Sequence, residues 1–354
     1  MESWKIKREI SVISNQLASP FTFFINRLHK SRYEKTKKKL IRLTDGAAPL
    51  NREIAIFLIY QPKGVAASVL RTCRHLVAKG VSPLVVTNAP LNETDRARLE
   101  EVTWRIMERP NFGYDFGGYR EGFLHLHDQG IQADAVLALN DSIWFPLFAE
   151  SDLLDRLLQL NFDVVSPVVA QFKHRAGETF LHSYMMRFGR RALQSEGFIS
   201  YWRELPMSNN KMAVVRGGEK RLAMRMKAIG LTTGALWSTE DVAAAIVELP
   251  EPEFQKAVAF AAEIYRASRK RFHGAETFAN MPRDERKALV ASGYFGRDLL
   301  KTYPGVTIGQ MRAHFLKKLR QGPFAKVRNA VLTSDRASLL DPVVREELEN
   351  WDAR

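Results

Sequence analysis

The chain has 354 residues, of which 45% are hydrophobic and 26% are charged, a composition that excludes a wholly disordered protein. Its net charge of +14 is concentrated at the two ends. Residues 1–45 hold eleven Lys and Arg against four Asp and Glu, and residues 297–329 hold eight against one. Because the positive charge lies at both ends of the chain and the middle is neutral, the charge pattern favours a surface that binds an anionic partner. The alternative interpretation is that both ends are charged helices exposed to solvent.

The number of cysteines and the hydropathy of the sequence indicate the cellular compartment of the protein. Cys73 is the one cysteine of the sequence, so an intramolecular disulfide is excluded, and this suits a reducing compartment. The basic N-terminus is not followed by an apolar segment long enough for a secretory signal, and no apolar run of about 18 residues is present. We therefore expect a protein on the cytoplasmic side that does not span a membrane.

The N-terminal region, residues 1–50, is predicted to be a basic amphipathic segment. It contains apolar side chains at helical spacing, namely Phe21, Phe24, Ile25 and Leu28. Gly and Pro at positions 46 and 49 then predict a linker. Basic amphipathic segments can lie on an anionic membrane surface, and residues 5–39 and 312–328 both fit that description.

Buried strands alternate with amphipathic helices along residues 51–238. Strands are predicted at 54–60, 84–88, 104–107, 134–139, 162–169 and 182–188. Helices are predicted at 65–77, 94–102, 118–127, 152–160, 192–203 and 219–230. This alternation predicts a mostly parallel sheet with right-handed crossovers, as in nucleotide-binding α/β domains. Residues 239–354 are predicted to be a helical appendage.

A glycine-rich motif, Asn111-Phe-Gly-Tyr-Asp-Phe-Gly-Gly-Tyr119, follows the third predicted strand. Ligands of open α/β sheets sit beyond the carboxyl ends of the strands, where glycines allow close backbone approach and a helix N-terminus can receive a phosphate. Asp115 adds a carboxylate for ribose hydroxyls, a metal or a base edge. The alternative is a glycine-rich turn in which Asp115 caps the helix. The spacing matches neither a dinucleotide fingerprint nor a P-loop, which excludes dehydrogenases and P-loop NTPases.

A second polar motif, Asn140-Asp141-Ser142, ends the fourth predicted strand. A carboxylate there can hold a divalent cation that bridges a diphosphate and stabilises a leaving nucleoside diphosphate. The alternative is a polar turn in which Asp141 caps a short helix. Because both motifs follow strands of one parallel sheet, we expect them to converge in space.

Together these motifs give the chain a family resemblance. Asn-x-Gly-x-Asp, the following Tyr and then Asn-Asp-Ser resemble the rhamnan synthesis protein F family of bacterial polysaccharide glycosyltransferases, over roughly residues 52–235. Segments 182–188, 198–202 and 219–230 match more loosely. The resemblance implies a GT-A-like, Rossmann-like fold and transfer of rhamnose or a related sugar from a nucleotide donor, with dTDP-rhamnose favoured. A lipid-linked glycan acceptor would place the protein peripherally on the inner membrane.

The candidate site has donor, catalytic and acceptor parts. Donor-binding residues are predicted to be Asn111, Gly113, Asp115, Gly117, Tyr119, Asn140 and Ser142. Asp141 is the candidate ligand of a divalent cation, Mg²⁺ or Mn²⁺, although its motif offers one carboxylate where Asp-x-Asp offers two.

Transfer with inversion needs a general base, for which Glu219 is the candidate and Asp163 the alternative. Glu219 could instead be a stabilising charge in the first turn of its helix. The candidate acceptor-binding residues, each with ordinary packing or hydrogen bonding as the alternative, are His182, Tyr184 and Trp202.

Two other classes of function stay open at this point. One is a non-catalytic module that binds a nucleotide or sugar, which the single carboxylate of Asp141 leaves open. The other is nucleic-acid binding, suggested by the charge alone. Because no helix-turn-helix, zinc-ligand spacing or RNA-recognition motif accompanies that charge, no nucleic-acid partner is expected.

Overall fold

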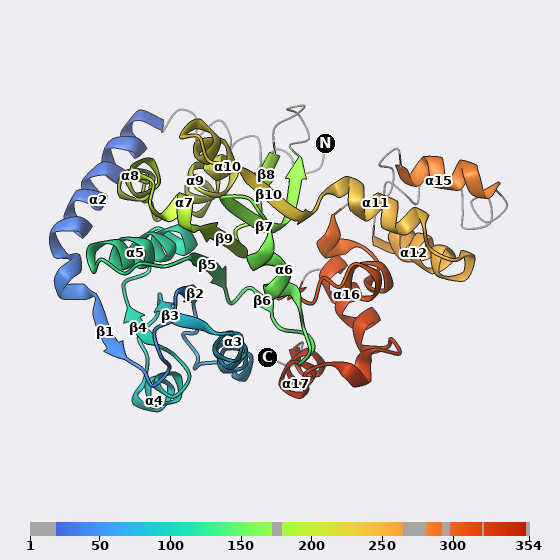
Figure 1. Cartoon of the computed structure of the whole chain (residues 1–354), viewed down its shortest axis with the longest axis horizontal. Coiled ribbons are helices and arrows are strands. Elements are labelled where there is room, and N and C mark those ends of the chain that lie inside the picture. The colour runs from blue at the N-terminus through green and yellow to red at the C-terminus, as the bar shows by residue number, and fades with distance from the viewer. Residues whose placement is uncertain (1–18, 172–178, 265–280, 292–297, 321, 352–354) are drawn as a thin grey trace.

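The structure is a computed structural model that describes residues 19–171, 179–264, 281–291, 298–320 and 322–351. Its centre is one sheet flanked by helices on both faces (Figure 1). The strands of that sheet are β1 (Arg42–Asp45), β2 (Glu53–Ile59), β3 (Val81–Thr87), β4 (Arg105–Glu108), β5 (Ala135–Asn140), β7 (Val164–Gln171), β8 (Thr179–Leu181), β9 (Met185–Gly189) and β10 (Thr233–Trp237).

The strand order is β1-β4-β3-β2-β5-β9-β7-β10, with β8 paired to β7. Pairs among β4, β3, β2 and β5 are parallel, as is β7 with β10. β9 runs antiparallel between β5 and β7, and β1 is an antiparallel edge on β4. The predicted mostly parallel α/β sheet is confirmed. Its long apolar strands follow from burial of both faces.

One face of the sheet is covered by α5 (Tyr114–Asp128), α8 (Glu196–Glu204) and α10 (Glu219–Ala228), with α2 (Ser19–Leu40) outside them. The other is covered by α3 (Ala67–Ala78), α6 (Leu153–Gln159), α11 (Thr239–Val247) and α12 (Glu251–Ile264). Alternate side chains of β2 enter the two cores, because successive residues of a strand point to opposite faces.

Shorter elements complete the described chain. They are α4 (Glu93–Glu100), α7 (Arg190–Leu193), α9 (Lys211–Gly217), α15 (Arg283–Ala291), α16 (Gly322–Leu332), α17 (Pro342–Glu349), the strand pair β6 (Ile143–Trp144) and β11 (Leu316–Lys317), and the short helical turns η1 (Leu299–Lys301), η2 (Gly305–Gln310) and η3 (Ala337–Leu339).

The predicted strands and helices are present, with three kinds of difference. The sixth predicted strand is β9, which starts later than expected and is antiparallel. The single helix expected at 192–203 is divided into α7 and α8. Several short elements were not predicted, because they carry no clear periodicity of apolar and polar residues: the strands β1, β6, β8, β10 and β11 and the helix α9.

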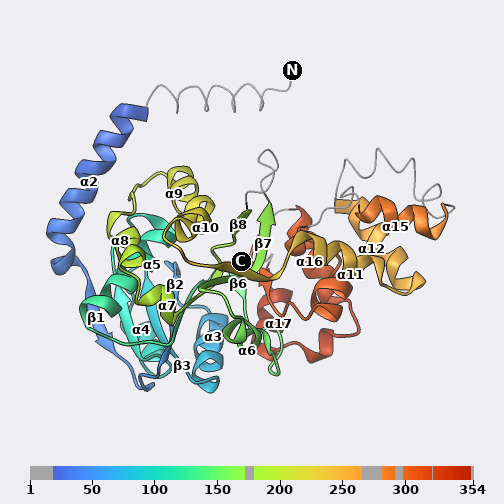
Figure 2. The same ribbon diagram turned by 45° about the horizontal axis from the view of Figure 1, so that its top comes forward.

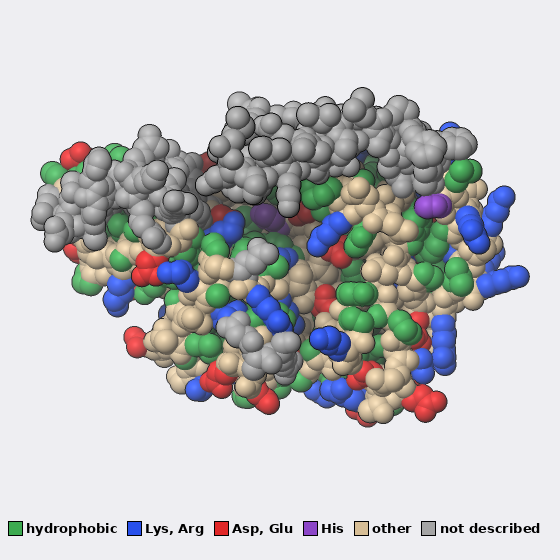
Figure 3. Space-filling view, turned by 180° about the vertical axis from the view of Figure 1, so that it is seen from behind, with side chains coloured by type: hydrophobic (Ala, Val, Ile, Leu, Met, Phe, Trp, Pro, Cys, Tyr) green, Lys and Arg blue, Asp and Glu red, His purple; other side chains and the backbone are tan. Residues whose placement is uncertain are grey.

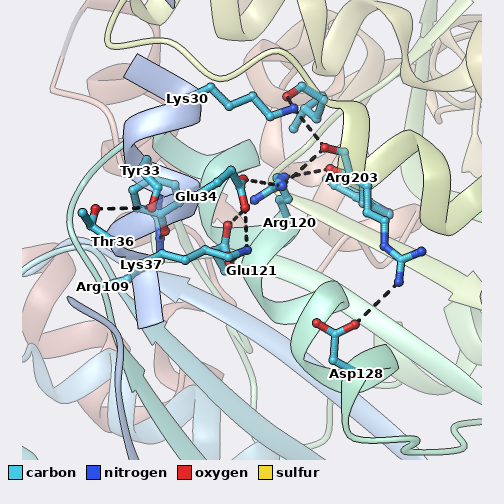
Figure 4. Close-up of polar contacts among 12 residues, drawn as sticks. Lys30, Tyr33, Glu34, Thr36, Lys37, Arg109, Arg120, Glu121, Asp128 and Arg203 are labelled. Carbon is cyan, nitrogen blue, oxygen red and sulfur yellow. Dashed lines mark hydrogen bonds and ion pairs between the residues drawn. The ribbon is translucent and has the colours of Figure 1, made fainter. Parts of the chain in front are cut away.

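The basic helix α2 is fastened to the sheet domain by charged contacts with α5 and α8 (Figure 4). Lys30 Nζ donates to the carbonyl of Leu205 at 2.9 Å. Lys37 Nζ donates to Glu121 Oε2 at 3.1 Å, and Arg120 pairs with both Glu121 and Glu34. Lys30 and Lys37, which carry part of the N-terminal positive charge, therefore make contacts within the fold.

The boundaries predicted at residues 50 and 238 stay predictions, and contacts cross both of them. Gly46, expected in a linker, donates its N–H to the carbonyl of Trp104 at 2.8 Å. On the other side, β11 pairs with β6, and Trp144 Nε1 donates to Glu347 of α17 at 3.0 Å. Figure 2 shows α2 and the C-terminal helices at opposite sides of the sheet.

The buried Glu121 contacts predict a specific stability effect. Its side chain is 4% exposed and pairs with Lys37 and Arg120. Glu121→Gln should lower the free energy of unfolding by about 3 kcal/mol, because it removes the more deeply buried of the two carboxylates that neutralise Lys37 and Arg120 and leaves them to share Glu34. Asp128→Asn on the same helix is the control, since Asp128 is 62% exposed and its pair with Arg203 at 3.6 Å is worth about 0.5 kcal/mol. Equal urea denaturation midpoints for the two variants would contradict the assignment.

Candidate active site

A cleft of about 460 Å³ opens at the carboxyl ends of the central strands. Six side chains that define it come from five segments of the chain: Tyr60, Asn88, Asn111, Asp115, Lys211 and Glu219. The crossovers of a parallel sheet bring these segments to one edge, which is where such folds bind ligands.

The two polar motifs come together at this edge, as their positions after parallel strands predicted. Asn140 Nδ2 donates to Asp115 Oδ2 at 3.1 Å. Asn140 Oδ1 accepts from the backbone N–H of Ser142 at 3.2 Å and from its hydroxyl. Burial raises the pKa of Asp115, and the neighbouring Asp141 adds to the rise. A carboxylate, an amide and a hydroxyl therefore form one hydrogen-bonded row.

Asp141 faces a second, adjoining cleft of about 740 Å³ whose lining also includes Tyr60. Asp141 Oδ2 accepts from the Tyr60 backbone N–H at 2.9 Å and from Gln61 Nε2 at 2.6 Å. Burial raises the pKa of Asp141, and those two hydrogen bonds oppose the rise. Tyr60 is 53% exposed, so it presents an aromatic face between the two clefts.

Glu219 is the first residue of α10 and lies in the wall of the first cleft. Its Oε1 accepts from the Ser183 backbone N–H at 3.2 Å and lies 3.9 Å from His182 Nδ1. Burial lowers the pKa of His182, so its imidazole is neutral at pH 7. The His182 ring stacks on Tyr184 with ring centroids 5.4 Å apart. Glu219 is thus a carboxylate held by the backbone and beside an uncharged ring.

Lys317 of β11 belongs to the same site and was not foreseen. Its Nζ donates to Ser142 Oγ at 2.6 Å and lies 5.1 Å from the Tyr184 ring centroid. Burial lowers the pKa of Lys317 to about 8, while Asp115 and Glu219 favour its charged form. The contact spans 175 residues of sequence, so no local motif could have revealed it.

Three smaller contributors were also missed. Tyr60 was placed at the end of its strand but not considered as a ligand contact, although that is the edge where ligands bind. Asn88, just after β3, and Lys211, at the start of α9, line the cleft without belonging to any recognisable motif.

The glycine-rich motif is helical from Tyr114 onward, so the helix begins earlier than the predicted residue 118. Gly113, with φ of +82°, is the N-cap of α5, and a Cβ there would lie 2.6 Å from Met207 Sδ. A Cβ on Gly117 would lie 2.2 Å from the Phe112 carbonyl oxygen. Both glycines are buried, which favours a packing role, and their donor contact stays a prediction.

Two predicted contact residues lie behind the cleft. Tyr119 is fully buried, and its hydroxyl donates to the Ser183 carbonyl at 2.8 Å, so it supports the strand connection that holds Glu219. Trp202 is also fully buried, with its ring stacked 4.7 Å from Phe123, so it forms part of the core and does not present a surface to a sugar.

Asp163, the alternative base, is wrongly placed for that role. It precedes β7 at the amino end of the strand and accepts from the backbone N–H of Thr232 at 2.7 Å. Burial would raise the pKa of Asp163, but hydrogen bonds from Thr232 and the charge of Arg191 outweigh it and lower the pKa. Asp163 therefore holds the start of β10 beside the start of β7 through its hydrogen bond with Thr232.

Protein side chains alone do not form a cage for the predicted divalent cation around Asp141. Within the described ranges, no three His, Cys, Asp or Glu side chains group closely enough to hold a metal ion. Hard divalent cations prefer several oxygen ligands, and Asp141 Oδ2 already accepts two hydrogen bonds from protein groups.

The amino-acid sequence is similar to a described protein family and to a relative of nearly the same length. A family model described as rhamnan synthesis protein F matches residues 84–271. A protein of Sinorhizobium fredii (strain NBRC 101917 / NGR234), named uncharacterized protein y4gN, is 30% identical over 351 residues, which cover 98% of this chain and 92% of the relative.

Two solved glycosyltransferases resemble the chain at low identity. The mannosyltransferase PcManGT from Pyrobaculum calidifontis, in complex with GDP-Man and Mn²⁺, is 13% identical, with a TM-score of 0.35 over 78% of this chain and 83% of that one. The glycosyltransferase GlyE of Streptococcus pneumoniae TIGR4 is 10% identical, with a TM-score of 0.33 over 86% of this chain and 64% of that one. At such scores neither structure assigns a ligand or a residue here.

The packing role of Gly117 can be tested by stability. Gly117→Ala should lower the free energy of unfolding by about 1–3 kcal/mol, because its methyl group would meet a backbone carbonyl. Gly217→Ala is the control: no atom lies within 4 Å of its added Cβ, and alanine favours a helix, so stability should stay equal or rise slightly. Unchanged stability of Gly117→Ala in guanidinium denaturation would argue for a ligand-binding role instead.

Proposed function

The chain belongs to the rhamnan synthesis protein F family of polysaccharide glycosyltransferases, and we propose that it transfers rhamnose or a related deoxyhexose from dTDP-rhamnose or a similar donor to a growing surface glycan. The observation that carries the proposal is the cleft at the carboxyl edge of the sheet. Asp115 and Glu219 line it from two separate segments, and the buried Asn140 of a third segment donates to Asp115.

The size and lining of the cleft support a nucleotide sugar as its ligand. Its volume of about 460 Å³ lies in the range of small-molecule sites, roughly 300–1,000 Å³. In the proposed complex, the exposed ring of Tyr60 stacks on the nucleobase and Asn88 hydrogen-bonds the base or ribose. Asp115, which is open to the cleft, accepts from sugar hydroxyls.

Glu219 is the proposed general base of an inverting reaction. The Ser183 N–H fixes one carboxylate oxygen, so the group is oriented before substrate binds. Glu219 takes the proton of the acceptor hydroxyl as that oxygen bonds to the anomeric carbon. The bond from that carbon to the diphosphate breaks at the same time, and its electron pair leaves with the nucleoside diphosphate.

The proposed acceptor is a lipid-linked glycan at the cytoplasmic face of the inner membrane. None of the helices in the described part of the chain is both long and apolar enough to span a bilayer. Lys and Arg side chains project from the edge where α2 lies (Figure 3). The exposed residues of that helix include Arg32, Lys35, Lys38 and Lys39. Leu28 is 53% exposed, whereas the side chains of Phe21, Phe24 and Ile25 lie outside the described residues.

The role of Glu219 predicts a separation of binding from chemistry. Glu219→Gln should lower kcat for sugar transfer by about 10²–10⁴-fold, because it removes the base, and should leave dTDP binding unchanged. Glu196→Gln is the control, since Glu196 is an exposed acid in the first turn of the neighbouring helix α8. Near-normal transfer by Glu219→Gln would remove it as the base. Inactivity of the wild-type protein towards every nucleotide sugar, with dTDP still bound, would favour a non-catalytic binding module.

The exposed face of α2 predicts reversible binding to anionic lipid. Replacing Lys35, Lys38 and Lys39 with Gln should weaken co-sedimentation with phosphatidylglycerol vesicles, since each lysine near such a surface contributes about 1 kcal/mol. These positions are exposed, so the packing of α2 through Lys37 should persist. Binding to neutral vesicles should be weak in both proteins. Equal pelleting of wild type and variant with anionic vesicles would contradict the proposal.

A further inference from the structure

The candidate site presents an electrostatic problem for any nucleoside diphosphate. Asp115, Asp141 and Glu219 all act on the same lysine and belong to the two adjoining clefts. A diphosphate that enters this edge brings further negative charge, and like charges at short range repel by several kcal/mol when partly buried. Binding and departure of a diphosphate there therefore need a cation.

One oxygen of each of these carboxylates is engaged by protein donors. Asp115 Oδ2 accepts from Asn140, Asp141 Oδ2 from Tyr60 and Gln61, and Glu219 Oε1 from the Ser183 backbone. A metal bound at these oxygens would compete with the hydrogen bonds that they already accept. The donor set is that of a hydrogen-bonded network and not of a cation cage.

Lys317 already supplies a positive charge at this place. β11 pairs antiparallel with β6, which sets Lys317 opposite Ile143, directly after the Asn140–Ser142 motif. Its Nζ donates to Ser142 Oγ, whose hydroxyl in turn donates to Asn140 Oδ1. An ammonium group has three N–H donors, and one of them contacts Ser142, which lines the second cleft, so the proposal directs the others to phosphate oxygens bound beside Ser142.

We propose that Lys317 binds the diphosphate of the nucleotide donor and neutralises the leaving group, so that transfer needs no divalent cation. This inference rests on the proposed function. When the bond between the anomeric carbon and the diphosphate oxygen breaks, the electron pair goes to that oxygen, and the Lys317 ammonium stabilises the charge. The acceptor oxygen takes the place of the diphosphate at the carbon, and Glu219 receives the acceptor proton.

The buried position of Lys317 suits this role. Its aliphatic stem and its contact with the Tyr184 ring fix the ammonium, so little motion must be lost when a phosphate binds. The neighbouring Lys318 has a different task, since its Nζ donates to Ser68 Oγ at 2.7 Å and pairs with Glu347 at 3.8 Å.

The test compares dTDP with dTMP, which lacks the second phosphate, by isothermal titration calorimetry in EDTA. Wild type should bind dTDP without added metal and more tightly than dTMP. Lys317→Met should lose about 10- to 100-fold in dTDP affinity, the scale of a hydrogen bond to a charged group, and should bind dTMP normally. Lys317→Arg should keep most of the dTDP affinity. Lys227→Met, an exposed lysine of α10, is the control and should change nothing.

A second readout separates the charge of Lys317 from a structural effect. Its pKa is lowered to about 8 by burial, with Asp115, Glu219 and Asp141 opposing that fall and Lys211 adding to it. The charged form is therefore present below about pH 8 and is lost as the pH rises through that value. The affinity of wild type for dTDP should fall across this range, and that of Lys317→Arg should not, because a guanidinium stays charged.

The outcomes distinguish this inference from the proposed function. If wild type binds dTDP only when Mg²⁺ or Mn²⁺ is added, or if Lys317→Met binds dTDP as wild type does, the role of Lys317 is overturned while a nucleotide-sugar site survives. If wild type binds none of dTDP, UDP and GDP, with or without metal, the proposed function fails together with this inference.

Discussion

The hydrogen bond from Asn140 to Asp115 is the contact on which the arrangement of the site depends. It joins the end of β5 to the first turn of α5, two places that are 25 residues apart in sequence. Asn140 also accepts from Ser142, which accepts from Lys317, so the row continues into β11 near the other end of the chain. In a partly buried site such linked hydrogen bonds reinforce one another. An aspartate in place of Asn140 could not donate to Asp115, and the row would break at its centre.

A second layer holds this row in position from the side of α2. The Tyr33 ring packs 5.1 Å from Phe112, and Arg109 donates to the Phe112 carbonyl and to Asn88, which lines the cleft. The basic N-terminal region therefore has two parts. Its inner lysines pair with α5 and α8, and its outer lysines remain exposed. Part of the excess positive charge therefore makes contacts within the fold, and the rest is exposed on the surface.

The sequence predicted those features that depend on local pattern. Continuous apolar runs indicated strands buried on both faces, and the carboxyl-end rule placed Asp115 and Asn140 at one edge, where they lie. The packing contacts of the glycines could not be predicted, because in sequence Gly113, Gly117 and the buried face of α5 look the same as a ligand-binding loop. Lys317 could not be predicted from the sequence, because only the pairing of β11 with β6 brings it to Ser142. Trp202 could not be assigned without knowing which face of α8 meets the core.

The most direct measurement is a crystal structure of the protein with dTDP, grown from metal-free solution. We expect the nucleobase beside Tyr60, the second phosphate within hydrogen-bond distance of Lys317 Nζ, and the sugar end of the site open towards Glu219. That result would place donor, counter-charge and base on one path along the carboxyl edge of the sheet. A dTDP molecule bound away from both clefts, or one held to Asp141 only through an added Mg²⁺, would contradict it.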